Sequence, residues 1–428
     1  MFRFRAAALA AALLVPVAAG AQDAAQVLTL DDAVRIALEN QPSLRRARAD
    51  TDAAEAGVAA ARAPLLPQVS AQTGYQFQQR PTAVDATPFV RAGRHNFSVG
   101  GTVDQLVTDF GKSTNRLRAS AALEDAQRES QRDVETSVVA NVRNAFFTAR
   151  ARKSLVGVAT RILENQQRHF EQVDAFVELG ARSPYDLAQA RTNVGSARSQ
   201  LAAAEGNYRV ARARLVQAMG LSQSAEFDVA DQSLPPIAGE GGSADELLPD
   251  ALAARPDVKA LEQRIQAQEY TLRSNRAGYL PSIGLNAGVS EIGPGFNDLS
   301  TSWVAGATLT WPIFQGGATR AAVSQADAAL AGLVADKDSL TQQVRYELEE
   351  SLAGIDSSLA ARASAEETVE SAREQVRLAE GRYETGVGSL LELSDAELAL
   401  QQAESALVQA EYDLSSARAL LLERLGQR

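Results

Sequence analysis

FSVGGTVDQLVTDFG, residues 97–111, and WVAGATLTWPIFQGG, residues 303–317, are two versions of one segment. They are separated by 206 residues (303 − 97), whereas Pro42 and its counterpart Pro256 are separated by 214 (256 − 42). The separation between matching residues, or shift, drops once along the chain, by 8 (214 − 206). This indicates one duplication in which one loop, near residues 80–95, was shortened. Further pairs that follow these shifts are Ala37 and Ala251, Pro67 and Pro281, Gly180 and Gly386, Asp186 and Glu392, and Gly220 and Gly426.

Alternating polarity around the repeated segment predicts four β-strands. We expect them at about residues 67–79, 95–108, 281–291 and 301–312. Their polar positions hold glutamine, serine, glycine and asparagine rather than lysine and glutamate. A half-buried sheet of a soluble protein would alternate in the same way. The uncharged polar face and the aromatic residues near the strand ends instead favour a membrane sheet with one wet face. These aromatic residues are Tyr75, Phe77, Trp303 and Trp311.

Each copy also contains helical segments of very different lengths. A short first helix precedes Pro42, with Thr29 or Asp31 as its cap, and its counterpart precedes Pro256, with Asp245 as the expected cap. Further helices are expected at about 43–63 and 257–278, at 112–180 and 318–386, and at 185–219 and 391–425. The two longest runs contain no proline and correspond to roughly 100 Å of helix each. Such helices are too long for a globular core, so they should lie along one another with small-residue contacts.

The lengths of these elements predict how they assemble. The two shorter helices of each copy, placed end to end, nearly match the long one and should run beside it. Four strands do not close a barrel, because single-chain barrels begin at about eight strands. Open sheet edges do not persist in lipid. Closure therefore requires several copies of the chain, and three copies would supply twelve strands.

The composition excludes several classes of function. Residues 1–21 have the basic start, apolar stretch and Ala19-Gly20-Ala21 site of an export signal. The formal charge of −11 argues against a nucleic-acid partner. There is no cysteine, and the two histidines, His95 and His169, form no metal-ligand pattern. We therefore expect no catalytic residues, no cofactor and no metal, and conclude that the chain is not an enzyme.

Four segments resemble the TolC family of outer-membrane efflux and secretion channels. They are LTLDDAVRIALENQP at 28–42, QLVTDFGK at 105–112, WPIFQGG at 311–317 and RYETGVGSLLELSDAELA at 382–399. The resemblance implies a mainly α fold in which a duplicated helix–β-hairpin–long-helix repeat forms, as a homotrimer, a 12-stranded outer-membrane β-barrel on a long periplasmic α-helical barrel. It also implies the exit channel of a tripartite efflux pump or a type I secretion system. Such a channel contacts outer-membrane lipid, a periplasmic adaptor and an inner-membrane transporter.

The resemblance assigns roles to the two helix–helix turns, here called the first tip (residues 177–183) and the second tip (383–389). The expected adaptor-docking residues are Gly180, Ala181, Ser183, Gly386, Val387 and Ser389. Glu392 and Asp395 share one helix face and are expected to form an acidic pore constriction. Tyr383 is expected to bond Asp186 as a gate contact. An arginine that the family can carry in the second tip is replaced by Gly388, and Arg182 of the first tip occupies the corresponding position. We therefore expect either that Arg182 is a gate contact in its place or that the gate is held closed less tightly.

The expected domain organisation follows the duplication. After the signal, residues 22–225 form the first repeat, 226–244 an equatorial inter-repeat segment, and 245–428 the second repeat. The loop Arg80–Gly93 is expected outside the cell. A periplasmic coiled-coil adaptor or scaffold is the main alternative, and it does not explain the strands. The sequence does not identify the exported substrate or the partner proteins.

Overall fold

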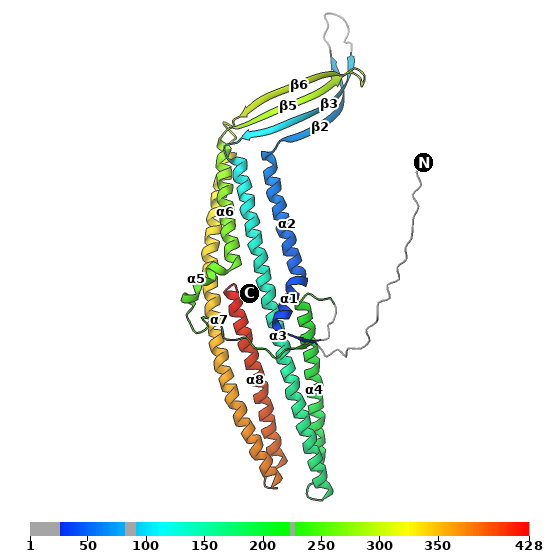
Figure 1. Cartoon of the computed structure of the whole chain (residues 1–428), viewed down its shortest axis with the longest axis vertical. Helices are drawn as coiled ribbons and strands as arrows, with labels where there is room; N and C mark the ends of the chain where they lie inside the picture. The colour runs from blue at the N-terminus through cyan, green and yellow to red at the C-terminus, as the bar shows by residue number, and fades with distance from the viewer. Residues whose placement is uncertain (1–25, 82–90, 223–226, 428) are drawn as a thin grey trace, which may run out of the picture.

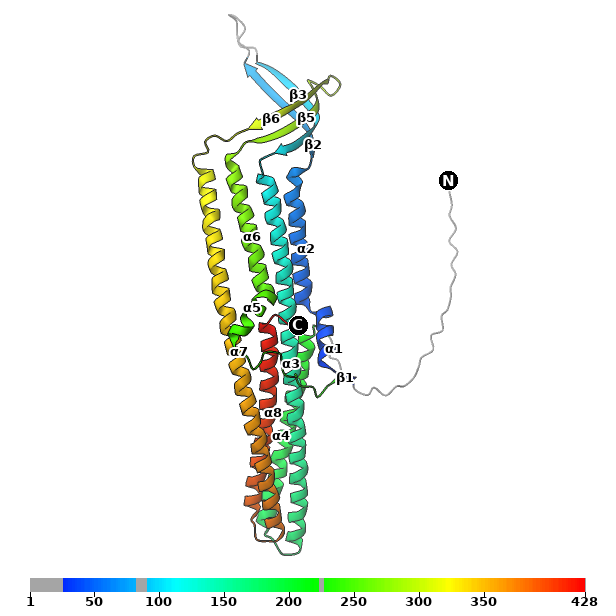
Figure 2. The ribbon, with the colours of Figure 1, turned by 60° about the vertical axis from the view of Figure 1, so that its left-hand side comes forward.

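The computed structural model describes residues 26–81, 91–222 and 227–427. The predicted export signal lies outside the described residues, as does the centre of the loop expected at Arg80–Gly93. The described chain is an elongated column of helices with a curved sheet at one end (Figure 1). A turned view shows that both helix–helix turns lie at the opposite end (Figure 2).

The two copies fold into matching sets of elements. The first set is β1 (Gln26–Leu28), α1 (Leu30–Asn40), α2 (Pro42–Arg62), β2 (Gln68–Pro81), β3 (Arg91–Thr108), α3 (Lys112–Glu178) and α4 (Pro184–Ala218). The second is β4 (Phe227–Val229), α5 (Ala244–Ala254), α6 (Pro256–Arg276), β5 (Ser282–Gly293), β6 (Ser300–Thr310), α7 (Ala318–Glu384) and α8 (Leu390–Arg424). The long helices α3 and α7 both have 67 residues, and α4 and α8 both have 35.

Local signals in the sequence explain most helix starts. Proline occupies the first position of α2, α4 and α6, where its missing N–H leaves no bond unmade. Thr29 caps α1 as predicted, because its hydroxyl accepts a bond from the Asp32 N–H (3.2 Å). The prediction that Asp245 caps α5 is wrong. The helix begins after Ser243, and Asp245 lies in the first turn, where it pairs with Arg345 (2.6 Å).

The four long strands form one antiparallel sheet in the order β2-β3-β5-β6. The register places Val69 opposite Val103, Val103 opposite Ala287 and Ala287 opposite Ala305, so one apolar face continues across all four strands. Apolar side chains of this face are exposed in the single chain, with Trp303 80% exposed. Both ends of the expected loop at Arg80–Gly93 belong to strands, since β2 continues to Pro81 and β3 starts at Arg91.

The helices form a single curved layer whose order differs between its two halves. Beside the sheet the order is α2, α3, α6 and α7, and toward the tips it is α4, α3, α8 and α7 (Figure 1). The expected end-to-end stacking is present, with α2 above α4 and α6 above α8. The layer therefore ends at α2 and α4 on one side and at α7 on the other. No helix in the described ranges is both long and apolar enough to cross a membrane.

Two glycines make the stacking joints possible. Gly220 follows α4 with φ of 74°, and a Cβ there would lie 2.8 Å from the Gln41 Cα, at the joint of α1 and α2. Gly426 follows α8 with φ of 69°, and its Cβ would lie 3.0 Å from the Arg255 Cα. Only glycine permits both this backbone conformation and this close approach. Each short helix therefore abuts the next in the same way in both copies.

Apolar burial is concentrated at these joints. One core includes Leu44, Phe146, Phe147, Leu215 and Met219, and its counterpart in the second copy includes Val344, Leu348, Ile355, Leu421 and Leu425. The inter-repeat segment packs on the first core through β4, which pairs in parallel with β1. Asp228 anchors it by accepting bonds from Lys153 (2.6 Å) and the Tyr208 hydroxyl (2.7 Å).

Candidate functional site

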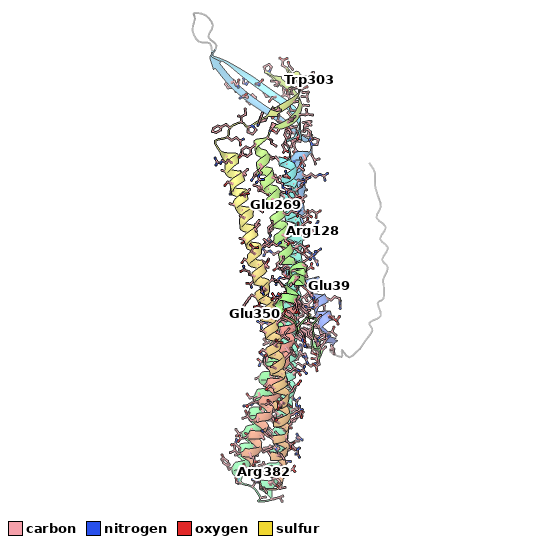
Figure 3. All side chains as sticks on the ribbon, turned by 90° about the vertical axis from the view of Figure 1, so that its left-hand side faces the viewer. Glu39, Arg128, Glu269, Trp303, Glu350 and Arg382 are labelled. Atoms are coloured by element: carbon pink, nitrogen blue, oxygen red, sulfur yellow. The ribbon has the colours of Figure 1, made fainter. Side chains whose placement is uncertain are left out.

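The two tips lie side by side at the end of the column away from the sheet. Arg382 marks this end in Figure 3, whereas Trp303 lies in the sheet at the other end. In the first tip the Ala181 N–H donates to the Phe176 carbonyl of the last helical turn (2.8 Å). In the second tip the Val387 N–H donates to the Arg382 carbonyl in the same way (3.0 Å). This is the Schellman turn that follows a left-handed glycine. The residues involved are Phe176, Gly180 and Ala181 in the first tip and Arg382, Gly386 and Val387 in the second.

Serine caps the helix that leaves each tip. Ser183 and Asp186 form a reciprocal capping box, in which the Asp186 carboxylate accepts the Ser183 N–H (3.3 Å). Ser389 caps α8 by accepting the Glu392 N–H (3.1 Å). Around these caps several apolar side chains are largely exposed, namely Leu179 (81%), Tyr185 (75%), Val387 (72%) and Leu391 (70%). The tips therefore present an apolar surface, of which the sequence analysis named only Val387.

The expected hydrogen bond between Tyr383 and Asp186 is not formed. Tyr383 is only 3% exposed, and its hydroxyl has no hydrogen-bond partner among the described residues. The Asp186 carboxylate is instead engaged with its own helix cap. Burial raises the pKa of the Tyr383 hydroxyl, and the nearby Asp186 carboxylate adds to that increase while Arg182 opposes it.

Arg182 connects the two tips. Its guanidinium lies over the Tyr383 ring, 4.8 Å from the ring centroid, which is the geometry of a cation–π contact. The ring belongs to a small buried cluster with Val173, Ala190, Ala379 and Leu393, to which α3, α4, α7 and α8 all contribute. The structure thus brings two of the expected gate residues, Arg182 and Tyr383, together through a cation–π contact, while the third, Asp186, forms no hydrogen bond to Tyr383.

The two acidic residues of the expected constriction have different surroundings. Glu392 forms an ion pair with Arg382 across the second tip, with 2.9 Å between the Arg382 Nε and the Glu392 Oε1. Asp395, one helical turn further along α8, is exposed and has no ion pair within the described chain. Across the described ranges, no group of three or more histidine, cysteine, aspartate or glutamate residues is arranged to hold a metal ion.

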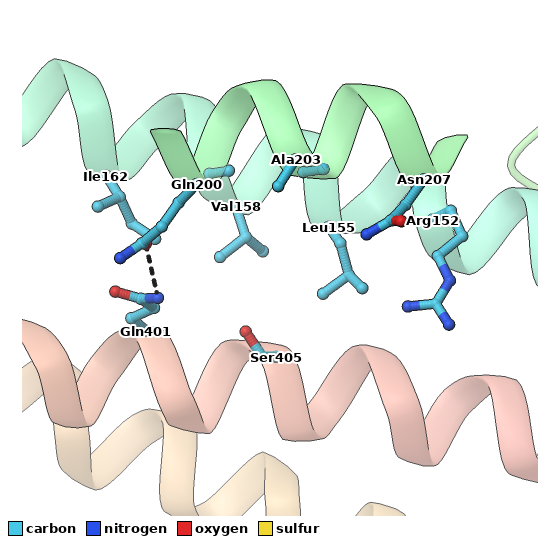
Figure 4. Close-up of a pocket in the computed structure, with 11 residues that line it drawn as sticks. Arg152, Leu155, Val158, Ile162, Gln200, Ala203, Asn207, Gln401 and Ser405 are labelled. Atoms are coloured by element: carbon cyan, nitrogen blue, oxygen red, sulfur yellow. Dashed lines mark hydrogen bonds between the residues drawn. The ribbon is translucent and has the colours of Figure 1, made fainter. Parts of the chain in front are cut away.

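Above the tips the two hairpins are joined along α3 and α8, a contact we call the seam. Part of the seam is a groove where Leu155, Val158 and Ile162 of α3 face Gln401 and Ser405 of α8 (Figure 4). The Gln401 amide crosses the groove to the Gln200 side chain of α4 (3.1 Å). Apolar groups that face polar groups across a groove form a weaker joint than an interdigitated core.

Nearer the tips the seam contains a half-buried acid–histidine contact. Glu397 of α8 accepts bonds from the His169 Nε2 (2.6 Å) and the Gln166 Nε2 (2.7 Å), both on α3. The His169 Nδ1 lies 3.3 Å from the Gln172 Oε1. Both ring nitrogens therefore face oxygen acceptors, which favours the doubly protonated ring. The bond to Glu397 raises the pKa of His169, with Gln172 and Glu380 contributing, against the opposing effect of burial.

Sequence reasoning missed Arg382, Glu397 and the role of His169. Glu397 and Arg382 both lie within the segment 382–399 that carries the family resemblance. The hydrophobic periodicity does not indicate which faces of α3 and α8 meet. The sequence therefore could not predict which of these residues form pairs.

Comparison with known proteins identifies the family. The family described as Outer membrane efflux protein matches residues 33–221 and 247–427. The starts of the two matched segments differ by 214 (247 − 33) and their ends by 206 (427 − 221), which are the two shifts of the duplication. The chain belongs to this family of outer-membrane proteins, and the resemblance to TolC-like channels is confirmed. This result disfavours the adaptor alternative.

Individual relatives agree with the family. Outer membrane protein OprJ of Pseudomonas aeruginosa is 27% identical over 378 residues, covering 85% of this chain and 77% of OprJ. The probable efflux pump outer membrane protein TtgC of Pseudomonas putida is also 27% identical, covering 86% of this chain and 76% of TtgC. The fold is similar to that of a membrane protein from Pseudomonas aeruginosa, with a TM-score of 0.81, 26% identity and coverage of 93% and 90%. It is also similar to the CusC structure, with a TM-score of 0.80, 24% identity and 97% coverage of both chains.

The His169 contact predicts a pH-dependent seam. A folded-state pKa above the ordinary value of about 6.5 means that the charged ring stabilises the seam below that pH. This contribution is lost as the pH rises through the folded-state pKa. Because the chain has two histidines, ¹³C-histidine labelling gives two signals, and His95→Gln assigns them. The His169 midpoint should lie above about 6.5 and should fall in Glu397→Gln. A wild-type midpoint at or below 6.5 would contradict the assignment.

Proposed function

We propose that three copies of this chain assemble into the outer-membrane exit channel of a tripartite efflux pump. The observation that carries the proposal is the pair of open edges on one subunit. β2 and β6 end the sheet, and the helical layer ends at α2 and α4 on one side and at α7 on the other. Joining β6 of one copy to β2 of the next would pair every strand of a twelve-stranded barrel. The exposed apolar side chains Val69, Trp303 and Leu309 would then face lipid.

In this assembly the helical layers of three subunits enclose a tunnel that extends into the periplasm. The inter-repeat segment, held on the outside of the layer by Asp228 and by the pairing of Arg418 with Glu240 (2.8 Å), would form a band around its middle. Toward the tips the tunnel would narrow. Glu392 and Asp395 of three subunits would place six carboxylates at this constriction. Rings of carboxylates attract cations and disfavour the passage of free anions.

Opening of the constriction would separate the two hairpins of each subunit. The contacts that resist this motion are the Arg182–Tyr383 stack at the tips and the polar bonds of the seam, of which Glu397 accepts two. The groove beside Gln401 leaves the seam incompletely packed. An incompletely packed contact between helices can change from one arrangement to another more readily than a close-packed core.

The tips are also the proposed docking surface for a periplasmic adaptor that links the channel to an inner-membrane transporter. Their exposed apolar side chains, Leu179, Tyr185, Val387 and Leu391, surround the turn residues Gly180, Ala181, Ser183, Gly386 and Ser389. Exposed apolar groups gathered on a turn are typical of a protein-binding surface. The relatives named for antibiotic, toluene and solvent efflux favour small molecules as cargo over the polypeptides of type I secretion.

A complementation experiment tests the proposed function. The host is a bacterial strain without its own outer-membrane efflux channel, supplied with an adaptor and an inner-membrane transporter from the organism that encodes this chain. Expression of the wild-type chain should lower the accumulation of ethidium. Val387→Glu should abolish the effect, since a charge at an apolar contact costs about 2 kcal/mol or more of binding free energy. Val387→Thr, which keeps the shape of the side chain, should retain activity.

Unchanged ethidium accumulation with wild-type protein present in the outer membrane would contradict the efflux function. Full activity of Val387→Glu would remove the second tip from the docking surface and leave the efflux function in place.

Single-channel recording in planar bilayers tests the gate contacts. Arg182→Ser removes a cation–π contact of about 0.5–1 kcal/mol from each subunit, so the ratio of open to closed channels should rise about two- to fivefold for every subunit whose hairpins separate on opening. Tyr383→Phe should behave like wild type, because the hydroxyl it removes bonds nothing in the described subunit. Arg209→Ser, on an exposed face of α4, is the control. Opening by Tyr383→Phe alone would mean that the hydroxyl forms a closing bond, and an unaffected Arg182→Ser channel would exclude the stack from the gate.

A further inference from the structure

The two tips carry arginine at positions that are not equivalent. The 206-residue shift relates Phe176 to Arg382 and Arg182 to Gly388. The first tip therefore has its arginine after the turn, whereas the second has it in the last helical turn before it. The two tips share the same type of backbone turn, so the exchange mainly changes the side-chain chemistry of the tips.

The backbone of the second tip leaves little room for a side chain at position 388. The Arg382 carbonyl accepts the Gly388 N–H at 2.8 Å, whereas the equivalent distance from the Arg182 N–H to the Phe176 carbonyl is 3.2 Å. A Cβ at Gly388 would lie 3.0 Å from both the carbonyl carbon and the Cβ of Arg382. A side chain at position 388 would therefore displace the end of α7 by a few tenths of an ångström, whereas Arg382 brings a positive charge to the tip from the helix itself.

Arg382 uses that position to reach Glu392. Its Nε lies 2.9 Å from the Glu392 Oε1. Asp186, the counterpart of Glu392, returns to its own helix cap through the Ser183 N–H. The Glu392 carboxylate therefore pairs with an arginine across the tip, whereas the Asp186 carboxylate bonds to the cap of its own helix. Asp395, one turn away on the same face of α8, remains exposed.

We infer that Arg382 is a selectivity-determining residue of the channel, which offsets the charge of Glu392 and leaves Asp395 as the only uncompensated carboxylate of the constriction. The inference rests on the proposed channel. Three subunits would give the constriction a net charge of minus three instead of minus six. A weaker negative field reduces the local excess of cations and lowers the barrier to anionic solutes. The constriction would thus admit cargo of either sign while retaining a preference for cations.

Reversal potentials in planar bilayers under a potassium chloride gradient test this inference. Arg382→Ala should raise the ratio of cation to anion permeability at least about twofold, because the net charge becomes minus six. Arg382→Gln, which keeps most of the side chain, should do the same. Glu392→Gln should bring the ratio close to one, because Arg382 then offsets Asp395. The double variant Arg382→Ala with Glu392→Gln should return to the wild-type ratio, because its net charge is again minus three.

Arg345→Ala is the matched control. It removes the same charge from α7, but from a residue paired with Asp245 far from the tips, beyond the roughly 10 Å over which charges act at 0.1 M salt. Its permeability ratio should equal that of wild type.

The outcomes distinguish a failure of the proposed channel from a failure of the proposed role of Arg382. A wild-type protein that gives no conductance would overturn the proposed channel. A conducting wild type whose ratio is unchanged in both Arg382 variants would overturn the role of Arg382 and leave the channel intact. A double variant that fails to return to the wild-type ratio would show that Arg382 acts by shaping the tip rather than by its charge.

Discussion

Unpaired strand edges are the constraint on which the rest of this structure depends. A backbone N–H or C=O left without a partner in hydrocarbon costs several kcal/mol, and water is absent there to supply one. β2 and β6 each present a full row of such groups. Their side chains add to the constraint, because the register aligns the apolar residues of all four strands on one exposed face. In the proposed channel, lipid would cover this face and strands of the neighbouring subunits would pair with both edges.

The duplication builds the subunit from a small number of repeated helices, strands and joints. Helices of the same length recur in both copies, and Gly220 and Gly426 make the same close joint at the ends of α4 and α8. These shared parts set the shape of the layer. The copies differ where contacts between the hairpins are made. Tyr383 stands opposite Val177 in the alignment of the repeats, Arg382 opposite Phe176, and His169 opposite Gln375 (375 − 169 = 206). These three positions, at which the two copies carry different residues, lie at the tips and the seam.

Most of the fold could be predicted from the sequence because its signals are local. Proline at helix starts, glycine at helix ends and alternation along the strands set the type and length of each element to within a few residues. The errors also have local causes. Ser243, two residues before Asp245, occupies the capping position of α5, and β2 and β3 extend further into the expected loop than alternation indicates. The site was less predictable. The bond expected from Asp186 to Tyr383 competes with the cap that Asp186 forms, and the pairings of Arg382 and Glu397 depend on how the helices are rotated against one another.

Disulfide cross-linking between sheet edges measures the central claim most directly. The chain has no cysteine, so pairs introduced along β2 and β6 report only on these two strands. If each subunit depends on its neighbours to complete the barrel, oxidation in outer membranes should yield covalent dimers and trimers and no larger species. Protein that remains monomeric for every pair along both strands, while present in the outer membrane, would contradict the account.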